Sequence, residues 1–222
     1  MTLRTTAKVA GLATLLYIAA GFGNEFFLGR ATHAEGIAAT LGQLVAHVTD
    51  LRLTILFKLL ECLSAFVLAA TLYGITREQD HELAMLGLVC RAAEGVTLAV
   101  SIRMNLGLLW LVGSRLGMDA QTTNAVAATL LMPAPPLGGV FYAVGSMIFA
   151  ALMLRGRMIP VAIAWLGIAS SALLVIGVPL QLAGWASARV VLALWVLALV
   201  YSLAIGFWLI VKGVNPPRAV NS

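Results

Sequence analysis

Charged side chains are scarce in this sequence of 222 residues, because Asp, Glu, Lys and Arg together make up only 10% of it. A soluble domain carries about 25% charged residues. Hydrophobic residues account for 61% of the chain, which is more apolar surface than a soluble fold of this length can bury. The scarcity of charge therefore excludes a soluble globular domain and predicts a protein whose solvent is largely lipid.

Residues that bind metals or act as nucleophiles are also few. The two cysteines, Cys62 and Cys90, lie inside apolar stretches, so a disulfide framework is not supported and both are expected to be buried thiols. The histidines, His33, His47 and His81, lie in expected connectors and form no His-x-x-His or His-Glu-x-x-His pair. The sequence also has no P-loop and no Gly-x-Ser-x-Gly motif. We therefore predict no metal site and no cofactor.

Long apolar runs are what the sequence has in abundance. A crossing of the bilayer takes about twenty apolar residues. The predicted membrane helices are residues 8–28, 52–75, 83–112, 137–154, 160–183 and 188–211. We therefore predict an all-α, polytopic membrane helix bundle with six transmembrane helices. Residues 1–214 are expected to form one domain, and residues 215–222 a flexible tail.

The connectors between these runs differ in length. Residues 74–81 and 155–157 are short, so the helices that they join should form antiparallel hairpins. Two connectors exceed twenty residues, a length that usually carries structure or function. The first, residues 28–51, is expected to hold a short interfacial helix because it has an apolar stripe at helical spacing. The stripe consists of Ile37, Leu41, Leu44, Val45 and Val48. The second, residues 113–136, ends in Met132-Pro133-Ala134-Pro135-Pro136, which should be extended or turned.

Basic residues are scattered at the ends of the apolar runs, so the net charge of +5 does not indicate a nucleic-acid partner. With the N-terminus inside, seven basic residues are cytoplasmic: Arg4, Lys8, Arg77, Arg155, Arg157, Lys212 and Arg218. Four are then external: Arg30, Arg52, Arg115 and Arg189. Because positive charge favours the cytoplasmic side, we expect a bacterial inner-membrane protein with both termini in the cytoplasm.

Ionisable residues occur inside two neighbouring membrane helices, where an unpaired charge is costly. Lys58 and Glu61 lie three residues apart on one helix, and Arg91 and Glu94 lie three apart on the next, so each pair shares a helix face. The short turn between the helices centres near residue 78. That register places Glu61 and Glu94 at nearly the same depth, close to the middle of the membrane.

The sequence leaves two interpretations of these charges open. Two carboxylates in a low dielectric cannot both ionise cheaply, whereas two flanking cations favour both charges. In the first interpretation, Arg91 and Glu94 form a structural ion pair that fixes helix register. In the second, Glu61 and Glu94 are acid/base or hydrogen-bonding groups in a polar pocket.

The second interpretation defines a set of candidate site residues. The catalytic candidates are Glu94 and Glu61, and the ligand-binding candidates are Arg91, Lys58, Asn105, Ser101, Arg103, Asn24, Glu25 and Gln181. Ser101 and Asn105 follow Glu94 at helical spacing. Arg103 lies across the helix from Glu94 and is expected to pair elsewhere or to extend outward.

Four short motifs resemble a known family. They are Thr6-Ala7-Lys8-Val9-Ala10-Gly11-Leu12, Asn24-Glu25-Phe26-Phe27, Cys90-Arg91-Ala92-Ala93-Glu94-Gly95 and Leu154-Arg155-Gly156-Arg157-Met158-Ile159-Pro160. With them the chain resembles, over nearly its whole length, a bacterial family of multi-pass membrane proteins known as domain of unknown function family 4386. The resemblance implies a single six-helix domain and recurrent use of the Arg91 and Glu94 positions. It implies no activity.

Three functions remain open from the sequence. The first is a polar intramembrane pocket for a lipid-like or amphipathic small molecule, with or without acid/base chemistry, enclosed by the first, second, third and fifth membrane helices. The second is a non-enzymatic accessory or assembly subunit of a larger membrane complex. The third is a small-solute or proton-coupled carrier, although only Gly177 and Pro179 indicate the interrupted helix that carriers use. Membrane lipids, a hydrophobic small molecule, and a protein partner or second copy are the expected partners.

Overall fold

All the secondary structure in the described part of the chain is helical. The computed structural model describes residues 2–113, 119–132 and 136–216. The helices are α1 (Leu3–Thr32), α2 (Ile37–Ala46), α3 (Val48–Thr76), α4 (His81–Gly113), α5 (Ala120–Leu131), α6 (Leu137–Arg155), α7 (Val161–Leu182) and α8 (Ala188–Val211). The all-α prediction is confirmed, and each predicted membrane helix is present with its ends shifted by no more than five residues.

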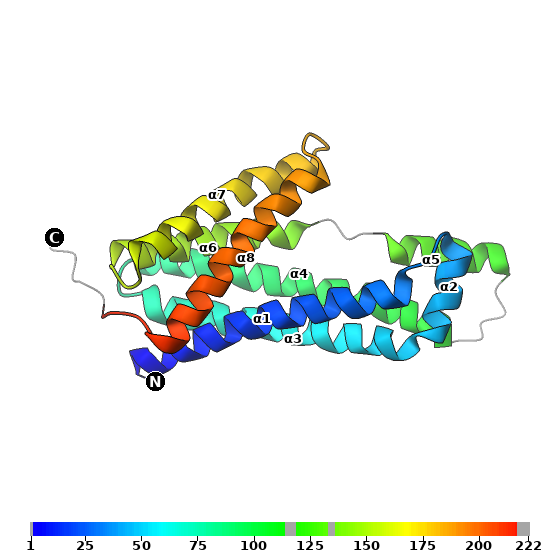
Figure 1. The fold of residues 1–222 in the computed structure, drawn as a ribbon, viewed down its shortest axis with the longest axis horizontal. Coiled ribbons are helices and arrows are strands. Elements are labelled where there is room, and N and C mark those ends of the chain that lie inside the picture. Colours follow the sequence, from blue (N-terminus) through cyan, green and yellow to red (C-terminus); the bar gives the residue numbers. More distant parts are fainter. Residues whose placement is uncertain (1, 114–118, 133–135, 217–222) are drawn as a thin grey trace.

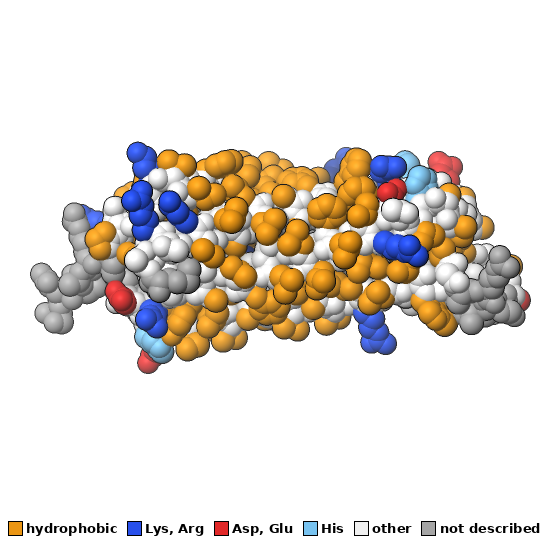
Figure 2. Space-filling model, turned by 90° about the horizontal axis from the view of Figure 1, so that it is seen from below, with side chains coloured by type: hydrophobic (Ala, Val, Ile, Leu, Met, Phe, Trp, Pro, Cys, Tyr) orange, Lys and Arg blue, Asp and Glu red, His pale blue; other side chains and the backbone are white. Residues whose placement is uncertain are grey.

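Within the described residues, six helices are long and apolar enough to cross a membrane: α1, α3, α4, α6, α7 and α8. Figure 2 shows hydrophobic side chains in a broad band across the middle of one face, with Lys and Arg side chains toward both ends. This distribution matches the apolar core and the polar interfaces of a bilayer. The chain is therefore a multi-pass membrane protein with six membrane helices.

The two ends of the bundle differ. The end that holds the start of α1, the α3–α4 and α6–α7 turns and the last turn of α8 is called here the terminal end, and it lies at the left in Figure 1. The far end holds α2 and α5, beyond the α7–α8 turn. Helices α1, α3 and α4 contain 29 to 33 residues. At the helical rise they span about 45 Å, which exceeds the hydrocarbon thickness of about 30 Å and carries them to the far end.

The far end has a small apolar core of its own. Leu44 of α2 packs there with Ala31 of α1, Leu51 of α3 and Leu108 of α4, and all four are buried. Helix α2 is the short helix predicted in the first connector. Its side chains anchor it to the three long helices rather than only to a membrane surface, since Leu44 is fully buried.

Helix α5 lies in the second long connector and is not predicted by the sequence analysis. Ala127 is its one fully buried residue in this structure, so the helix has no broad apolar stripe that periodicity could reveal. Its start is marked instead by Asp119, whose side chain accepts a hydrogen bond from the backbone N–H of Thr122. Pro133 and Pro135 lie outside the described residues, as does most of the predicted tail, and Pro136 precedes α6.

Close packing fixes the relative depth of the membrane helices. A Cβ atom added to Gly11 of α1 would lie 2.6 Å from the carbonyl oxygen of Gly206 of α8, so only glycine allows this approach. Between α3 and α4, the Cys62 thiol donates a hydrogen bond to the carbonyl oxygen of Gly95 over 3.2 Å. The hairpin register predicts this pairing, and it places the adjacent Glu61 and Glu94 at similar depths.

Candidate functional site

A buried ion pair lies in the middle of the bundle. Arg91 and Glu94 of α4 are 1% and 2% exposed, and Nη1 of Arg91 lies 2.6 Å from Oε2 of Glu94. The two residues are three apart, so a single helix face carries both. Because no solvent screens the pair, attraction between the charges is far stronger than at a protein surface.

The ion pair leaves hydrogen-bonding capacity unused. Within the described residues, Nε and Nη1 of Arg91 and Oε2 of Glu94 have no hydrogen-bond partner. The 2.6 Å contact between Nη1 and Oε2 is close enough for strong attraction, but it is not aligned along an N–H direction as a hydrogen bond requires. A guanidinium has five N–H donors, and a buried donor without a partner destabilises the fold.

Two tyrosines flank the ion pair. The hydroxyl of Tyr17 on α1 donates a hydrogen bond of 2.6 Å to Oε1 of Glu94. The guanidinium carbon of Arg91 lies 4.8 Å from the ring centre of Tyr142 on α6 and 5.6 Å from that of Tyr17. Aromatic faces attract a desolvated guanidinium, so the cation is held by one carboxylate and two rings.

A glycine on the facing helix makes room for the arginine stem. A Cβ atom added to Gly145 of α6 would lie 2.8 Å from Cγ of Arg91, so a larger residue would displace the side chain. Tyr142 and Ser146, which precede and follow this glycine, both line the cavity beside Arg91. The segment around Gly145 therefore accommodates the arginine and surrounds it with polar groups.

The cavity beside Arg91 has a polar part and an apolar part. Its volume is about 30 Å³, room for about two water-sized groups. The polar lining consists of Thr14, Tyr17, Arg91, Tyr142, Ser146, Tyr201 and Ser202. The apolar lining consists of Leu68, Leu72, Phe149, Met153, Ile205 and Leu209. The helices that form it are α1, α3, α4, α6 and α8. The predicted pocket is enclosed by α1, α3, α4 and α7, so this cavity differs from that expectation at α6, α7 and α8.

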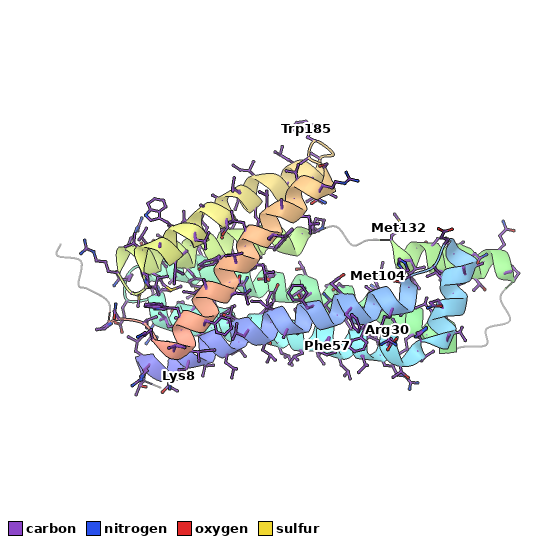
Figure 3. All side chains as sticks on the ribbon, in the orientation of Figure 1. Lys8, Arg30, Phe57, Met104, Met132 and Trp185 are labelled. Carbon is purple, nitrogen blue, oxygen red and sulfur yellow. The ribbon has the colours of Figure 1, made fainter. Side chains whose placement is uncertain are left out.

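The polar part lies near the membrane midplane. Tyr17 is nine residues from Lys8, which lies at the terminal end (Figure 3), and Tyr201 is eleven residues from Lys212. These separations correspond to about 14–17 Å along each helix, roughly half of the hydrocarbon thickness of about 30 Å. Leu209 lies within one turn of Lys212, so the apolar part of the lining runs from the midplane toward the terminal end.

The second predicted pair forms its own contact. Nζ of Lys58 donates a hydrogen bond of 2.8 Å to Oε2 of Glu61, and both side chains are largely buried. Oε1 of Glu61 lies near Gly21 of α1, 3.5 Å from where a Cβ would stand. Neither Glu61 nor Glu94 is among the described residues that line the cavity. The structure thus places two ion pairs at similar depth, with only Arg91 bordering the cavity.

The remaining predicted ligand-binding residues lie elsewhere. Asn105 is buried, Ser101 donates to the carbonyl oxygen of Leu98, and Arg103 is exposed. Nδ2 of buried Asn24 donates to Glu25 over 3.0 Å. Gln181 is half-buried near the end of α7. None of these residues belongs to the cavity lining as described.

Sequence reasoning missed the hydroxyl groups of the cavity. Tyr142 shares a hydrogen bond of 2.9 Å with Ser202 of α8, and Ser146 and Tyr201 border the same space. The sequence does contain a sign of these groups, which is their expected depth in the membrane. Ser146 is nine residues from Arg155, and Tyr17 is nine residues from Lys8, so both are expected near the same depth. Tyrosine is usually found at the membrane interfaces, so tyrosines near the middle of a membrane helix would have indicated a polar site.

The far end has a separate, open hollow between the last turns of α1 and α2, near Arg30 in Figure 3. It is about 540 Å³ and is lined by Glu25, Phe26, Gly29, Arg30, His33, Gln43 and His47. Asp50 lies 3.3 Å from Nε of Arg30 and 3.0 Å from Nδ1 of His47. Among the residues that the structure describes, no three His, Cys, Asp or Glu side chains lie close enough together to hold a metal ion.

The comparisons with known proteins identify a family. The model of the family described as Domain of unknown function (DUF4386) matches residues 9–213. No curated protein matches the chain, and no solved structure matches it. The matched range extends from the first membrane helix to the end of the last and includes both buried ion pairs. The chain therefore belongs to the domain of unknown function family DUF4386.

Proposed function

We propose that this protein binds the polar head of an amphipathic small molecule at Arg91, inside the membrane. The observation that carries the proposal is the Arg91 side chain. It is 1% exposed and it lines a cavity. Its Nη1 atom is engaged by Glu94 at 2.6 Å, but its Nε atom has no hydrogen-bond partner among the described residues. Small-molecule sites combine apolar walls with polar groups that fix orientation, and both kinds of residue line this cavity.

The lining favours an amphipathic ligand over a fully polar solute. The cavity of about 30 Å³ accommodates a small head group, and the hydroxyls beside Arg91 would orient it. The cavity of about 30 Å³ has no room for an alkyl chain as well, so a chain attached to that head would have to part the apolar side chains of the lining on its way toward Leu209 at the terminal end. Met153 is part of this lining, and a methionine side chain adapts readily to a neighbouring chain. Because Glu61 and Glu94 lie outside the lining, the proposal includes no acid/base step.

We also propose the orientation in the cell. The terminal end carries Arg4, Lys8, Arg77, Arg155, Arg157 and Lys212 among the described residues. Positive charge of this kind favours the cytoplasmic side, so the terminal end would face the cytoplasm of a bacterial inner membrane. The head group would then sit at the midplane and the chain would point toward the cytoplasmic leaflet.

Photo-cross-linking tests the proposal. The protein in phosphatidylcholine nanodiscs is exposed to dodecyl probes that carry a diazirine near the methyl end and a hydroxyl, phosphate or trimethylammonium head. We expect saturable labelling near Leu72, Met153 and Leu209 with at least one probe. Trp165 of α7 is 57% exposed and serves as the lipid-facing control, where labelling should rise in proportion to probe. If labelling near Met153 rises in proportion to probe concentration for every probe, as it does at Trp165, the proposal is refuted.

A further inference from the structure

We infer that the head group bound at Arg91 is uncharged and carries an oxygen that accepts hydrogen bonds; this rests on the proposed function. The candidates in this class are alcohols, carbonyl compounds and ethers attached to an alkyl chain. The inference comes from the charge balance at the site, the direction of the unused donors and the chemistry of the neighbouring hydroxyls.

The charges around the cavity already balance. Of the described residues that line it, Arg91 alone is charged, and Glu94 neutralises it at 2.6 Å. Lys58 and Glu61 neutralise each other at 2.8 Å. An anionic or cationic head would therefore add a net charge to a low-dielectric site, and burying an uncompensated charge is costly. An uncharged head adds none.

The donors that remain are in the plane of the guanidinium. The guanidinium carbon lies over the ring of Tyr142, 4.8 Å from its centre, so the ring occupies that side of the group. N–H bonds of arginine point outward in its plane, and Nε has no partner among the described residues. A ligand must therefore reach the edge of the group, and it must offer a lone pair, because arginine has no acceptor.

The hydroxyls suit an oxygen-bearing head for a second reason. Tyr142 and Ser202 share a hydrogen bond, and Tyr201 and Ser146 line the same space. Each hydroxyl can donate or accept, so together they can satisfy both the hydrogen and the second lone pair of an alcohol. A trimethylammonium head has no donor and no acceptor, and it would approach Arg91 as a like charge.

Competition in the wild-type protein tests the inference without a variant. Unlabelled dodecanol, dodecyl phosphate, dodecyltrimethylammonium and dodecane compete against the labelled probe near Met153 in phosphatidylcholine nanodiscs. We expect dodecanol to compete at a concentration about tenfold below that of dodecane, since a hydrogen bond to a charged group has about that effect. Dodecyl phosphate and dodecyltrimethylammonium should each compete only at a higher concentration than dodecanol.

Variants then connect the preference to Arg91. In Arg91→Met/Glu94→Gln, which removes both charges, the preference for dodecanol over dodecane should fall to within about twofold, whereas Arg103→Met, at an exposed arginine of the same helix, should retain it. Ser202→Ala serves as a milder variant that keeps the ion pair, and it should reduce the preference severalfold.

The outcomes separate the two proposals. Stronger competition by dodecyl phosphate or dodecyltrimethylammonium than by dodecanol would overturn the uncharged head and leave the binding site intact. Equal competition by dodecanol and dodecane would also overturn it. Failure of all probes to label saturably would overturn the proposed function itself, and the cavity would then hold water only.

Discussion

Replacing Glu94 by glutamine should destabilise the protein strongly. The substitution leaves Arg91 charged and buried at 1% exposure, and removing one partner of a buried ion pair costs about 3–5 kcal/mol. The rings of Tyr142 and Tyr17 still hold the cation, and the glutamine oxygen can still accept from Tyr17. We therefore expect a loss near the lower end of that range, about 3 kcal/mol.

The loss is measurable as a melting temperature in one detergent. For a chain of this size, 3 kcal/mol corresponds to a decrease of about 6–12 °C. The double variant Arg91→Met/Glu94→Gln removes the unpaired charge and should recover at least half of the decrease, because a buried ion pair can be replaced with little cost. The matched control Arg103→Met alters an exposed arginine on the same helix and should melt close to the parent. If Glu94→Gln melts within about 2 °C of the parent, water must screen the pair, and the argument from burial is wrong.

Three further predictions test orientation, packing and the far end. Reporter fusions at the C-terminal tail should read cytoplasmic, and fusions within α2 should read external; an external C-terminus would contradict the proposed orientation. Gly11→Val should lower the melting temperature by forcing α1 away from Gly206, whereas Gly29→Val, where a Cβ meets nothing within 4 Å, should lower it much less. The pKa of Asp119 is lowered chiefly by the hydrogen bond from the backbone N–H of Thr122. Its carboxylate therefore stabilises the start of α5 above the unfolded pKa, and this contribution is lost as the pH falls through the folded value. Amide exchange in α5 should accelerate in acid in the parent, relative to intrinsic rates, and much less in Asp119→Asn; the same acceleration in both would argue against the cap.

Most of the fold could be predicted because lipid imposes a simple rule on sequence. Each membrane helix must be an apolar run of sufficient length, so α6 and α8 are found with almost no error in their ends. The register of α3 against α4 was also predictable, since a short turn leaves the hairpin little freedom. Helix α5 was not, because Ala127 is its one fully buried residue in the described structure, so the helix shows no apolar stripe at helical spacing.

The site could be predicted only in part. Charged residues in a membrane stand out in a sequence, so Arg91 and Glu94 were evident as a pair. Sequence alone did not show which helices face Arg91, and tyrosines such as Tyr142 pass as ordinary apolar residues. The partner of Glu94 illustrates the same limit: Tyr17 is 77 residues away in the chain, and no local rule connects the two.

A crystal structure with a brominated ligand tests the central claim most directly. The protein is crystallised from a lipid phase with dodecanol that carries bromine at its methyl end, and the anomalous signal locates the bromine. The account predicts a bromine peak between Leu72, Met153 and Leu209, with continuous density leading to an oxygen within hydrogen-bonding distance of the Arg91 guanidinium. Bromine peaks confined to the lipid-facing surface, with separate water-sized density beside Arg91, would contradict it.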